Sequence, residues 1–312
     1  MPFMVNHKNT HSHHRKALLD ALQSVEKERA FAPLRVVLGT KNIIRSSATL
    51  ILRGYPSIIC IVGFGRVFTD YGILGRLIFW LLIKLLDFRS ALGFITENDE
   101  DYEWLSSVTK SPVYFTHGSG LDPSRFFKKV KVKSVRPKIG YLSRFGDSKC
   151  SDQVLRAARD LPKDRELVLA GWEITGSKYT DEFKKLALKR DNITFLGRLS
   201  GPTEVSNFFN DIDIFITPSL REGGNISLQE AIWHSVPFAT TSVAGCRILA
   251  KKFDGLHCDP NIFSDLILSE KILTHKPNLK EWPSKLKPYL INSVTKEYYL
   301  IFMKIVDNLN KR

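Results

Sequence analysis

Thr217-Pro-Ser-Leu-Arg-Glu-Gly-Gly-Asn-Ile-Ser-Leu-Gln-Glu-Ala-Ile-Trp-His-Ser-Val-Pro237 is the most informative segment of this chain. It follows an apolar run over residues 212–216 and leads into a helical pattern over residues 227–235. The glycine pair between them lets the backbone approach a ligand closely. Free N–H groups and the positive dipole end at the helix start attract an anion. The segment therefore predicts an anion-binding strand–turn–helix.

Two glutamates flank the start of this predicted helix. Glu222 stands before it, and Glu230 lies two turns inside it. Carboxylates in these places can accept hydrogen bonds from sugar hydroxyl groups. The alternative is an ordinary strand–turn–helix with Glu230 on a solvated face. The segment by itself leaves both interpretations open.

On both sides of this segment, short apolar runs alternate with helical patterns along the 312-residue chain. Strands are expected at residues 3–5, 35–39, 57–62, 91–95, 113–116, 138–142, 166–170, 193–196, 212–216 and 237–241. Helices are expected at residues 14–27, 42–53, 73–88, 100–106, 151–160, 181–189, 203–210, 227–235 and 293–309. This alternation predicts an α/β fold with parallel, doubly wound sheets. The charged segment 128–137 ends in proline and predicts a linker, so we expect two Rossmann-like domains facing a cleft.

The charge balance is strongly basic, with 46 Lys and Arg against 32 Asp and Glu and a formal net charge of +14. Such an excess attracts an anionic partner. An anionic membrane surface and a phosphorylated substrate both fit the charge. Nucleic acid fits it too, but no nucleic-acid recognition motif accompanies the charge, so we expect no nucleic-acid partner.

The cysteines and histidines do not suggest a metal site. Four widely spaced cysteines form no CxxC pair, which argues against a zinc site or a disulfide framework and favours reduced cytosolic thiols. Residues 1–16 contain no apolar stretch long enough for a secretory signal. They carry four histidines, including His7, without nearby acidic or thiolate partners. We therefore expect a loop at the start and a cytoplasmic protein.

Residues 72–89 are intensely apolar but are interrupted by Arg76, Lys84, Asp87 and Arg89. The uninterrupted run over residues 77–83 is far short of the ~20 residues that a membrane span needs. The pattern predicts an amphipathic helix. It fits a core helix, or a helix lying among lipid headgroups with its cations near the phosphates. The net charge favours the membrane surface.

Glu222 and Glu230 match the E-x7-E pattern of the GT4 family, and the chain resembles these retaining glycosyltransferases with the two-domain GT-B fold. The resemblance implies that Glu222 and the amides after it hold the sugar of a nucleotide-sugar donor, and that Glu230 binds the ribose. It implies donor contacts also from the loop around Gly197. The donor residues carried over after Glu222 are Gly223, Gly224, Asn225, Ile226 and Ser227.

A second match lies in the loop after the first strand of the second half. The family places an Arg and, five residues later, a Lys on the donor diphosphate, and Arg144 and Lys149 have this spacing. Charge builds on the departing phosphate when the glycosidic bond breaks, and fixed cations stabilise it. The resemblance therefore implies that Arg144, Lys149 and Glu222 are catalytic.

The first half resembles the family more loosely. Gly63-Phe-Gly65 is similar to the Gly-x-Gly loop of bacterial members that act on lipid-linked acceptors. Thr40 and Lys41 stand where related enzymes often have a histidine, so Lys41 and His7 are the acceptor-side candidates besides the two glycines. About thirty residues separate the first two strands, where the family usually has one or two more strand–helix units. The first domain therefore looks shortened.

The resemblance implies an acceptor-side domain at residues 1–127, a donor domain at residues 128–292, and a terminal helix at residues 293–312 that packs back on the first domain. The implied reaction is transfer of a sugar to a lipid-linked or polysaccharide acceptor with retention of configuration, at the cytoplasmic face of the inner membrane. The motifs require no cofactor and no metal besides the nucleotide-sugar co-substrate. Asp211-Ile-Asp213 begins a strand, which indicates a structural role.

Two alternatives remain open. A catalytically degenerate scaffold of a membrane polysaccharide-assembly complex fits the short first half. A sugar-nucleotide epimerase of the same fold fits the two-domain cleft, but lacks the arrangement of Glu222 and Glu230.

Overall fold

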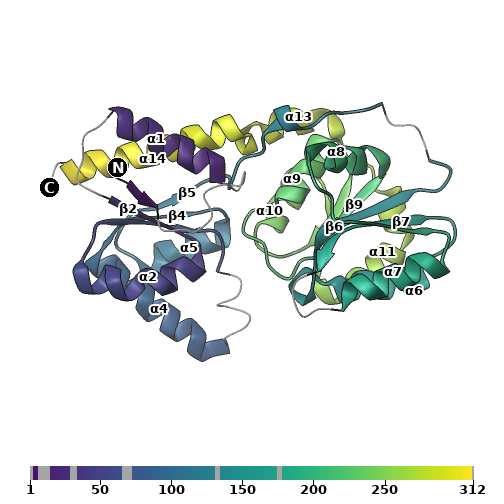
Figure 1. The fold of residues 1–312 in the computed structure, drawn as a ribbon, viewed down its shortest axis with the longest axis horizontal. Coiled ribbons are helices and arrows are strands. Elements are labelled where there is room, and N and C mark those ends of the chain that lie inside the picture. Colours follow the sequence, from purple (N-terminus) through teal and green to yellow (C-terminus); the bar gives the residue numbers. More distant parts are fainter. Residues whose placement is uncertain are drawn as a thin grey trace. The chain divides into compact units, whose positions relative to one another are not determined.

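The computed structural model describes residues 3–5, 15–28, 34–64, 72–130, 134–173 and 178–310, with the backbone alone for residues 3–5. The chain divides into two compact units (Figure 1). The first unit joins Met1–Gly120 to Pro288–Arg312, and the second comprises Leu121–Lys287. Each contains one parallel sheet covered by helices, so the predicted α/β class with parallel sheets is confirmed.

The first unit contains a five-stranded parallel sheet with the strand order β1-β2-β3-β4-β5. Its strands are β1 (Phe3–Val5), β2 (Leu34–Leu38), β3 (Ser57–Ile61), β4 (Ala91–Thr96) and β5 (Val113–Phe115). Its helices are α1 (Lys16–Glu28), α2 (Thr40–Arg53), α4 (Gly72–Arg89), α5 (Asp99–Val108) and α14 (Ile291–Asn310).

Alternate side chains of the strands in this sheet enter two separate cores, as the two-residue period of a strand requires. In β2, Leu34, Val36 and Leu38 belong to the core formed with α1 and α14. Val37 belongs to the core formed with α2, α4 and α5. Because both faces are covered, the strands appear in the sequence as continuous apolar runs. Figure 1 shows α1 and α14 on one face and α2, α4 and α5 on the other.

The first crossover of this sheet has the opposite hand to the next one. The path from β1 to β2 and the path from β2 to β3 advance in the same direction across parallel strands, yet α1 and α2 cover opposite faces. Crossovers between parallel strands are right-handed almost without exception. A further strand–helix unit after α1, placed beyond β1, would give every crossover the same hand. The topology therefore fits the short first half that the sequence indicates.

The second unit contains a six-stranded parallel sheet with the order β11-β10-β9-β6-β7-β8. Its strands are β6 (Lys138–Phe145), β7 (Glu166–Glu173), β8 (Ile193–Gly197), β9 (Ile214–Thr217), β10 (Phe238–Thr241) and β11 (Leu256–Cys258). Its helices are α6 (Ser151–Asp160), α7 (Tyr179–Lys189), α8 (Pro202–Asp211), α9 (Ile226–Trp233), α10 (Cys246–Lys252), α11 (Phe263–Leu268), α12 (Glu270–Thr274) and α13 (Trp282–Leu286). The chain leaves β6 towards β7 and β8, and later returns to the other side of β6 with β9. The junction between β6 and β9 is therefore the topological switch point of the sheet.

Every strand predicted from the sequence overlaps a strand of the structure. The predicted helices also occur, and most begin or end a residue or two away from the predicted bounds. The structure adds β11 and the helices α10 to α13. It also adds the short 3-10 turns Pro123–Arg125, Asp147–Lys149, Pro260–Ile262, Leu279–Glu281 and Lys287–Tyr289.

The first residues of the predicted linker are held against the second unit. The Asn210 side chain of α8 donates to the Phe127 carbonyl at 3.0 Å and accepts from the Lys129 N–H at 3.1 Å. The Lys128 ammonium lies 4.7 Å from the ring centroid of Trp233 in α9. These residues are therefore exposed but anchored to α8 and α9.

The terminal helix α14 is part of the first unit and packs along α1. Tyr299 donates to Glu28 at 2.6 Å, where α1 ends. Two residues earlier in α14, Glu297 contacts the His117 ring and its backbone N–H through its two carboxylate oxygens, at 2.7 and 3.0 Å. The helix is thus tied both to α1 and to the residues that follow β5.

Replacement of Phe302 tests how much α14 contributes to the first unit. Phe302 is fully buried in the core with α1, whereas Leu300 on the same helix is 55% exposed. Phe302→Ala is expected to lower the free energy of unfolding by about 3–5 kcal/mol, because it leaves a cavity. Leu300→Ala is the matched control and should change it by less than about 0.5 kcal/mol. Urea unfolding followed by circular dichroism measures both, and equal losses would contradict the packing.

Candidate active site

Lys149 and Glu222 meet at the switch point of the second sheet. Lys149 ends the turn after β6, and Glu222 lies in the loop after β9. Since β6 and β9 are adjacent parallel strands, their carboxyl ends lie at the same edge. The Lys149 ammonium donates a hydrogen bond to Oε1 of Glu222, and the two side chains are 16% and 15% exposed. Ser219 Oγ donates to the same carboxylate oxygen at 2.6 Å.

The turn after β6 has a fixed shape that presents Lys149. The Lys149 carbonyl accepts a hydrogen bond from the Tyr141 hydroxyl at 3.2 Å, and the Gly146 N–H donates to Ser151 Oγ at 2.9 Å. Cys150 adopts a left-handed conformation with φ 45°. Such a conformation favours glycine. The turn thus holds the cysteine in a backbone conformation that is uncommon for residues other than glycine.

The loops after β6 and β9 are joined through their backbones. The Leu220 N–H donates to the Ser148 carbonyl at 3.1 Å. This bond holds the segment before Glu222 against the turn that carries Lys149. The positions of the two loops therefore bring Lys149 and Glu222 within reach of each other.

Asn225 caps helix α9. Its Oδ1 accepts from the Leu228 N–H at 3.0 Å, and its Nδ2 donates to Thr217 Oγ1 at 2.9 Å. Both polar atoms of its side chain are therefore hydrogen-bonded within the protein. Only its backbone groups remain to bind a nucleotide-sugar. The helix begins at Ile226, one residue before the predicted start, and the first-turn N–H groups of Ile226 and Ser227 follow Gly223 and Gly224. This arrangement gives the loop the anion-attracting end that the sequence predicts.

A third loop, after β10, supports the glycine pair. Gly245 has φ +75°, and a Cβ placed on it would lie 2.3 Å from the Gly223 carbonyl oxygen. Thr240 Oγ1 donates to the Thr217 carbonyl at 3.1 Å, so β10 also fixes the end of β9. We did not predict this contribution from the sequence. Gly245, just before a helix, was the available signal.

Glu230 lies on α9 with its carboxylate shielded from water. Burial raises the pKa of Glu230 to about 7, while the positive charge of Arg125 opposes this rise. In the part of the chain that the structure describes, no group donates a hydrogen bond to this carboxylate. A shielded carboxylate without a donor can accept hydrogen bonds from ligand hydroxyl groups, as the resemblance implies for the ribose.

Arg144 and Gly197 lie on strands and not in loops. Arg144 belongs to β6, because the pairing of β6 with β7 continues through Arg144 and Trp172. Its side chain is exposed. Gly197 ends β8 with φ +71°. The guanidinium of Arg198 lies 5.0 Å from the ring centroid of Trp172, which is 42% exposed. The structure thus adds Trp172 and Arg198 to this edge of the sheet, whereas it does not bring Arg144 into the Lys149–Glu222 pair.

The first-unit candidates gather at the carboxyl edge of their own sheet. Thr40 Oγ1 donates to the Gly63 carbonyl at 3.0 Å, which joins the start of α2 to the end of β3. Lys41 is exposed in the first turn of α2. The Gly63 loop continues into Phe64, whose N–H donates to Asp101 at 3.2 Å. The remaining acceptor-side candidates, His7 and Gly65, lie outside the described residues.

Two acids at the same edge of the first sheet, the partly buried Glu97 and the buried Asp101, were not predicted. Glu97 directly follows β4, and burial raises its pKa to about 7. Burial also raises the pKa of Asp101 to about 6, although Asn98 and the Phe64 N–H donate to its carboxylate. The acidic run at residues 99–101 directly after a strand was the signal for them.

Within the described ranges, no group of three or more His, Cys, Asp or Glu side chains is arranged to hold a metal ion. Asp211 pairs with the Lys138 ammonium at 2.7 Å, and Asp213 accepts from the Lys138 N–H at 2.9 Å. Lys138 begins β6, so both acids lie at the amino edge of the sheet. They stabilise the strand start, at the edge opposite Lys149 and Glu222.

Residues 123–280 match the family model described as glycosyl transferases group 1. This range includes the turn that carries Lys149 and the whole loop from Glu222 to α9. Protein CapJ from Staphylococcus aureus is 32% identical over 76 residues, which are 23% of this chain and 19% of that protein. The aligned part thus spans about a fifth of the curated relative.

Solved structures resemble the whole chain more closely in fold than in sequence. Sucrose-phosphate synthase from Thermosynechococcus elongatus aligns with a TM-score of 0.70 at 14% identity, over 92% of this chain and 77% of that chain. HepE of Anabaena, in complex with UDP, aligns with a TM-score of 0.68 at 12% identity, over 92% of this chain and 82% of that chain. At these identities the likeness establishes the fold, which is GT-B.

Replacement of Glu230 by glutamine tests the shielded carboxylate. The pKa of Glu230 is about 7 in the folded protein, above the ordinary value of 4.5. The folded state therefore keeps its proton where the unfolded state has lost it, and stability falls as the pH rises through this window. Glu230→Gln does not titrate, so its stability relative to the natural protein should increase by up to about 3 kcal/mol between pH 4.5 and 7.5. Urea unfolding at several pH values measures this difference, and a difference that does not change with pH would contradict the shielding.

Proposed function

The chain belongs to the family of glycosyl transferases group 1, and on this premise we propose that it transfers a sugar from a nucleotide-diphosphate sugar to an acceptor hydroxyl group. The Lys149–Glu222 pair at the switch point carries this proposal. Ligands of doubly wound sheets bind beyond the carboxyl ends of the strands at such a point. The pair places there a cation suited to a diphosphate and a carboxylate suited to sugar hydroxyls.

The donor diphosphate competes with Glu222 for Lys149. In the free protein each of these two partly buried charges neutralises the other, and so neither is left unpaired. A bound diphosphate takes over the ammonium of Lys149 and receives further stabilisation from the first-turn N–H groups of α9. Glu222 is then available to accept hydrogen bonds from the donor sugar. Arg144, exposed at the end of β6, supplies a second cation on the phosphate side.

The reaction we propose proceeds with retention of configuration. The bond between the anomeric carbon and the phosphate oxygen breaks, and a bond from that carbon to the acceptor oxygen forms on the same face. The proton of the acceptor hydroxyl passes to the departing diphosphate. Lys149 and Arg144 stabilise the negative charge on this leaving group. The resemblance to retaining GT4 enzymes supports this course.

The nucleotide we expect is a uridine or guanosine diphosphate. HepE, which shares the fold, was solved with UDP, and this supports UDP as the first nucleotide to test. Glu230 is the residue that we propose for the ribose, because its shielded carboxylate has no donor within the described residues.

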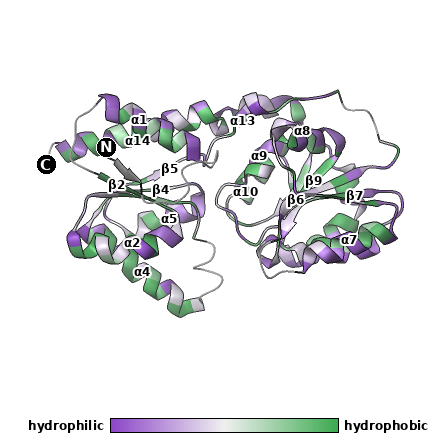
Figure 2. Ribbon diagram, in the orientation of Figure 1, coloured by the Kyte–Doolittle hydropathy of each residue, from purple (hydrophilic) through white to green (hydrophobic). Residues whose placement is uncertain are grey.

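Helix α4 supports an acceptor at a membrane surface. Much of α4 is coloured as hydrophobic in Figure 2, and several of its apolar side chains form an exposed stripe. The stripe consists of Leu74, Leu77, Ile78, Leu81, Leu85 and Phe88, with exposed fractions between 48% and 84%. Apolar stripes of this size mark interaction surfaces. No helix in the part of the chain that the structure describes is long and apolar enough to cross a membrane.

Cations accompany the stripe, which favours an anionic lipid surface over a protein partner. Helices α2 and α4 together carry Lys41, Arg45, Arg53, Arg76, Lys84 and Arg89, with Asp87 as their one carboxylate. An apolar face with flanking cations is the pattern of a helix that lies among lipid headgroups. We therefore propose a lipid-linked or polysaccharide acceptor, with the protein peripheral on the cytoplasmic face of the inner membrane.

Calorimetry with UDP, GDP and their sugar conjugates tests the donor site. One nucleotide should bind the natural protein, and Lys149→Ala should weaken that binding at least ~10-fold, a loss of about 1.4 kcal/mol. Lys163→Ala is the matched control, because Lys163 is exposed at the opposite edge of the same sheet. Absence of nucleotide binding by the folded natural protein would favour the degenerate scaffold, with which the unusual first crossover also agrees.

Vesicle flotation tests the apolar stripe. Leu77→Gln combined with Leu81→Gln should lower binding to vesicles of phosphatidylcholine with 30% phosphatidylglycerol by about 10-fold or more, because two apolar side chains no longer enter the lipid. Both residues are half exposed, so the variant should fold. Leu188→Gln in α7, with Leu188 88% exposed, is the control. Unchanged binding of the double variant would exclude the stripe as the membrane contact.

A further inference from the structure

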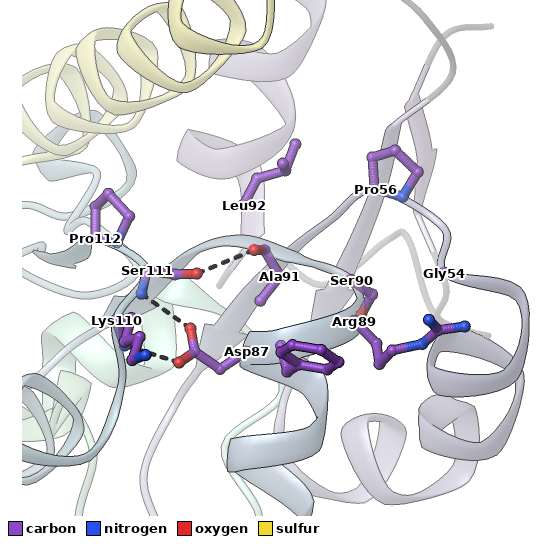
Figure 3. A pocket seen from close by; sticks show the side chains of 11 residues that line it. Gly54, Pro56, Asp87, Arg89, Ser90, Ala91, Leu92, Lys110, Ser111 and Pro112 are labelled. Atoms are coloured by element: carbon purple, nitrogen blue, oxygen red, sulfur yellow. Dashed lines mark hydrogen bonds between the residues drawn. The ribbon is translucent and has the colours of Figure 1, made fainter. Parts of the chain in front are cut away.

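A pocket of about 350 Å³ lies in the first unit at the amino edge of its sheet (Figure 3). The end of α4, the beginning of β4, the turn before β5 and the loop before β3 line it. The predicted acceptor-side residues Lys41 and Gly63 lie at the other, carboxyl edge. The pocket is therefore separate from every residue discussed for sugar transfer.

Two cations line this pocket. Arg89 donates from Nε to the Ile51 carbonyl at 3.2 Å, which anchors its guanidinium and leaves both terminal NH2 groups available. The ammonium of Lys110 has no hydrogen bond or ion pair to any residue that the structure describes. Arg89 and Lys110 lie on opposite sides of the lining (Figure 3). A guanidinium and an ammonium are both suited to the oxygens of a phosphate.

The one acid of the pocket, Asp87, is already engaged. Its two carboxylate oxygens accept the backbone N–H groups of Lys110 and Ser111 at 2.7 and 2.9 Å, as the dashed lines in Figure 3 show. These bonds hold the turn before β5 and offset part of the negative charge. The formal charge of the lining is positive, since Arg89 and Lys110 outnumber Asp87.

A buried hydroxyl group also lines the pocket. Ser90 is 6% exposed, and its Oγ has no hydrogen-bond partner in the structure. Buried polar groups in proteins are nearly always hydrogen-bonded. A hydroxyl group in the wall of a cationic pocket can donate to an anionic oxygen, so this unsatisfied group points to a ligand.

Large apolar side chains lie next to the pocket. Phe88, 84% exposed, is part of the lining and also ends the apolar stripe of α4. Leu52, 78% exposed, lies in the last turn of α2, beside the Ile51 carbonyl that holds Arg89. Phosphate-binding groups and exposed apolar side chains are thus combined at one place.

We propose that this pocket binds the phosphate of an anionic phospholipid headgroup and that Phe88 and Leu52 enter the lipid beside it. The charge of α2 and α4 and the apolar rim favour a lipid over a free sugar phosphate, which offers nothing to the exposed Phe88. The inference rests on the membrane association proposed above and makes it specific. The pocket sets which end of the first sheet approaches the membrane, whereas the stripe alone leaves this orientation free.

Charge-matched double variants test the proposal on vesicles of phosphatidylcholine with 30% phosphatidylglycerol at constant ionic strength. Arg89→Gln with Lys110→Gln removes the two cations of the pocket. Arg45→Gln with Lys84→Gln removes two cations from α2 and α4 outside the pocket. The pocket variant should lose at least ~10-fold in vesicle binding and the control about twofold, because diffuse attraction depends on charge alone. Equal losses of vesicle binding in the two double variants would overturn the proposal that the pocket binds the headgroup.

Ser90→Ala provides a second variant that keeps every charge. It should weaken vesicle binding about tenfold, because a hydrogen bond to a charged group is lost. Unchanged vesicle binding together with an unchanged melting temperature would show that the Ser90 hydroxyl group does not contact the phosphate.

Soluble ligands distinguish the two sources of phosphate. Glycerol 3-phosphate at millimolar concentration, against chloride at the same ionic strength, should release the natural protein from vesicles only partly. Calorimetry with inorganic phosphate in the absence of vesicles should detect no binding tighter than about millimolar. Tight binding of inorganic phosphate, lost in the pocket variant, would instead identify a free phosphate as the ligand and overturn the lipid.

Nucleotide binding separates this proposal from the proposed function. Arg89, Lys110 and Ser90 belong to the first unit, and the donor residues lie in Leu121–Lys287. All variants should therefore bind UDP or GDP as the natural protein does. If the natural protein binds no nucleotide while the vesicle results stand, the transferase proposal fails and the lipid pocket remains.

Discussion

The ion pair between Lys149 and Glu222 is the interaction on which the candidate active site depends. The two residues are 73 positions apart in the chain and meet because β6 and β9 are neighbours in the sheet. The backbone bond from Leu220 to Ser148 brings their loops together first, so the pair forms without a large loss of side-chain freedom. Loss of either partner leaves a partly buried charge unpaired, which is costly. In the reaction that we propose, a diphosphate replaces Glu222 as the counter-charge of Lys149.

The surrounding loops hold this pair through backbone geometry and not through further charges. Asn225 uses its whole side chain to cap α9 and to join β9, and Gly245 allows the loop after β10 to approach Gly223 closely. Both features fix the glycine pair, so the N–H groups at the start of α9 have a constant direction. A preorganised site of this kind stabilises developing charge without reorganisation at the moment of reaction.

In the first unit, the two edges of the sheet carry different kinds of side chains. Its carboxyl edge contains Gly63, Lys41 and the acids Glu97 and Asp101. Its amino edge carries a cationic pocket beside exposed apolar side chains. The first unit also contains a core between α1 and α14. That core is closed by residues from both ends of the chain.

The strands, the parallel sheets and the glycosyltransferase family follow from the sequence, because buried parallel strands are continuous apolar runs and the E-x7-E motif is contained in one loop. The spacing of Arg144 and Lys149 is likewise a local pattern, and it predicts the phosphate side of a donor. Only the tertiary structure decided that Lys149 pairs with Glu222 while Arg144 stays apart. The order of the strands in the sheet determines which loops are neighbours, and local sequence patterns do not specify that order. It also decided that the Asn225 side chain serves the fold, that Gly245 supports the site, and that Arg89, Lys110 and Ser90 share a pocket. These residues are separated along the chain, and the packing of sheet and helices alone brings them together.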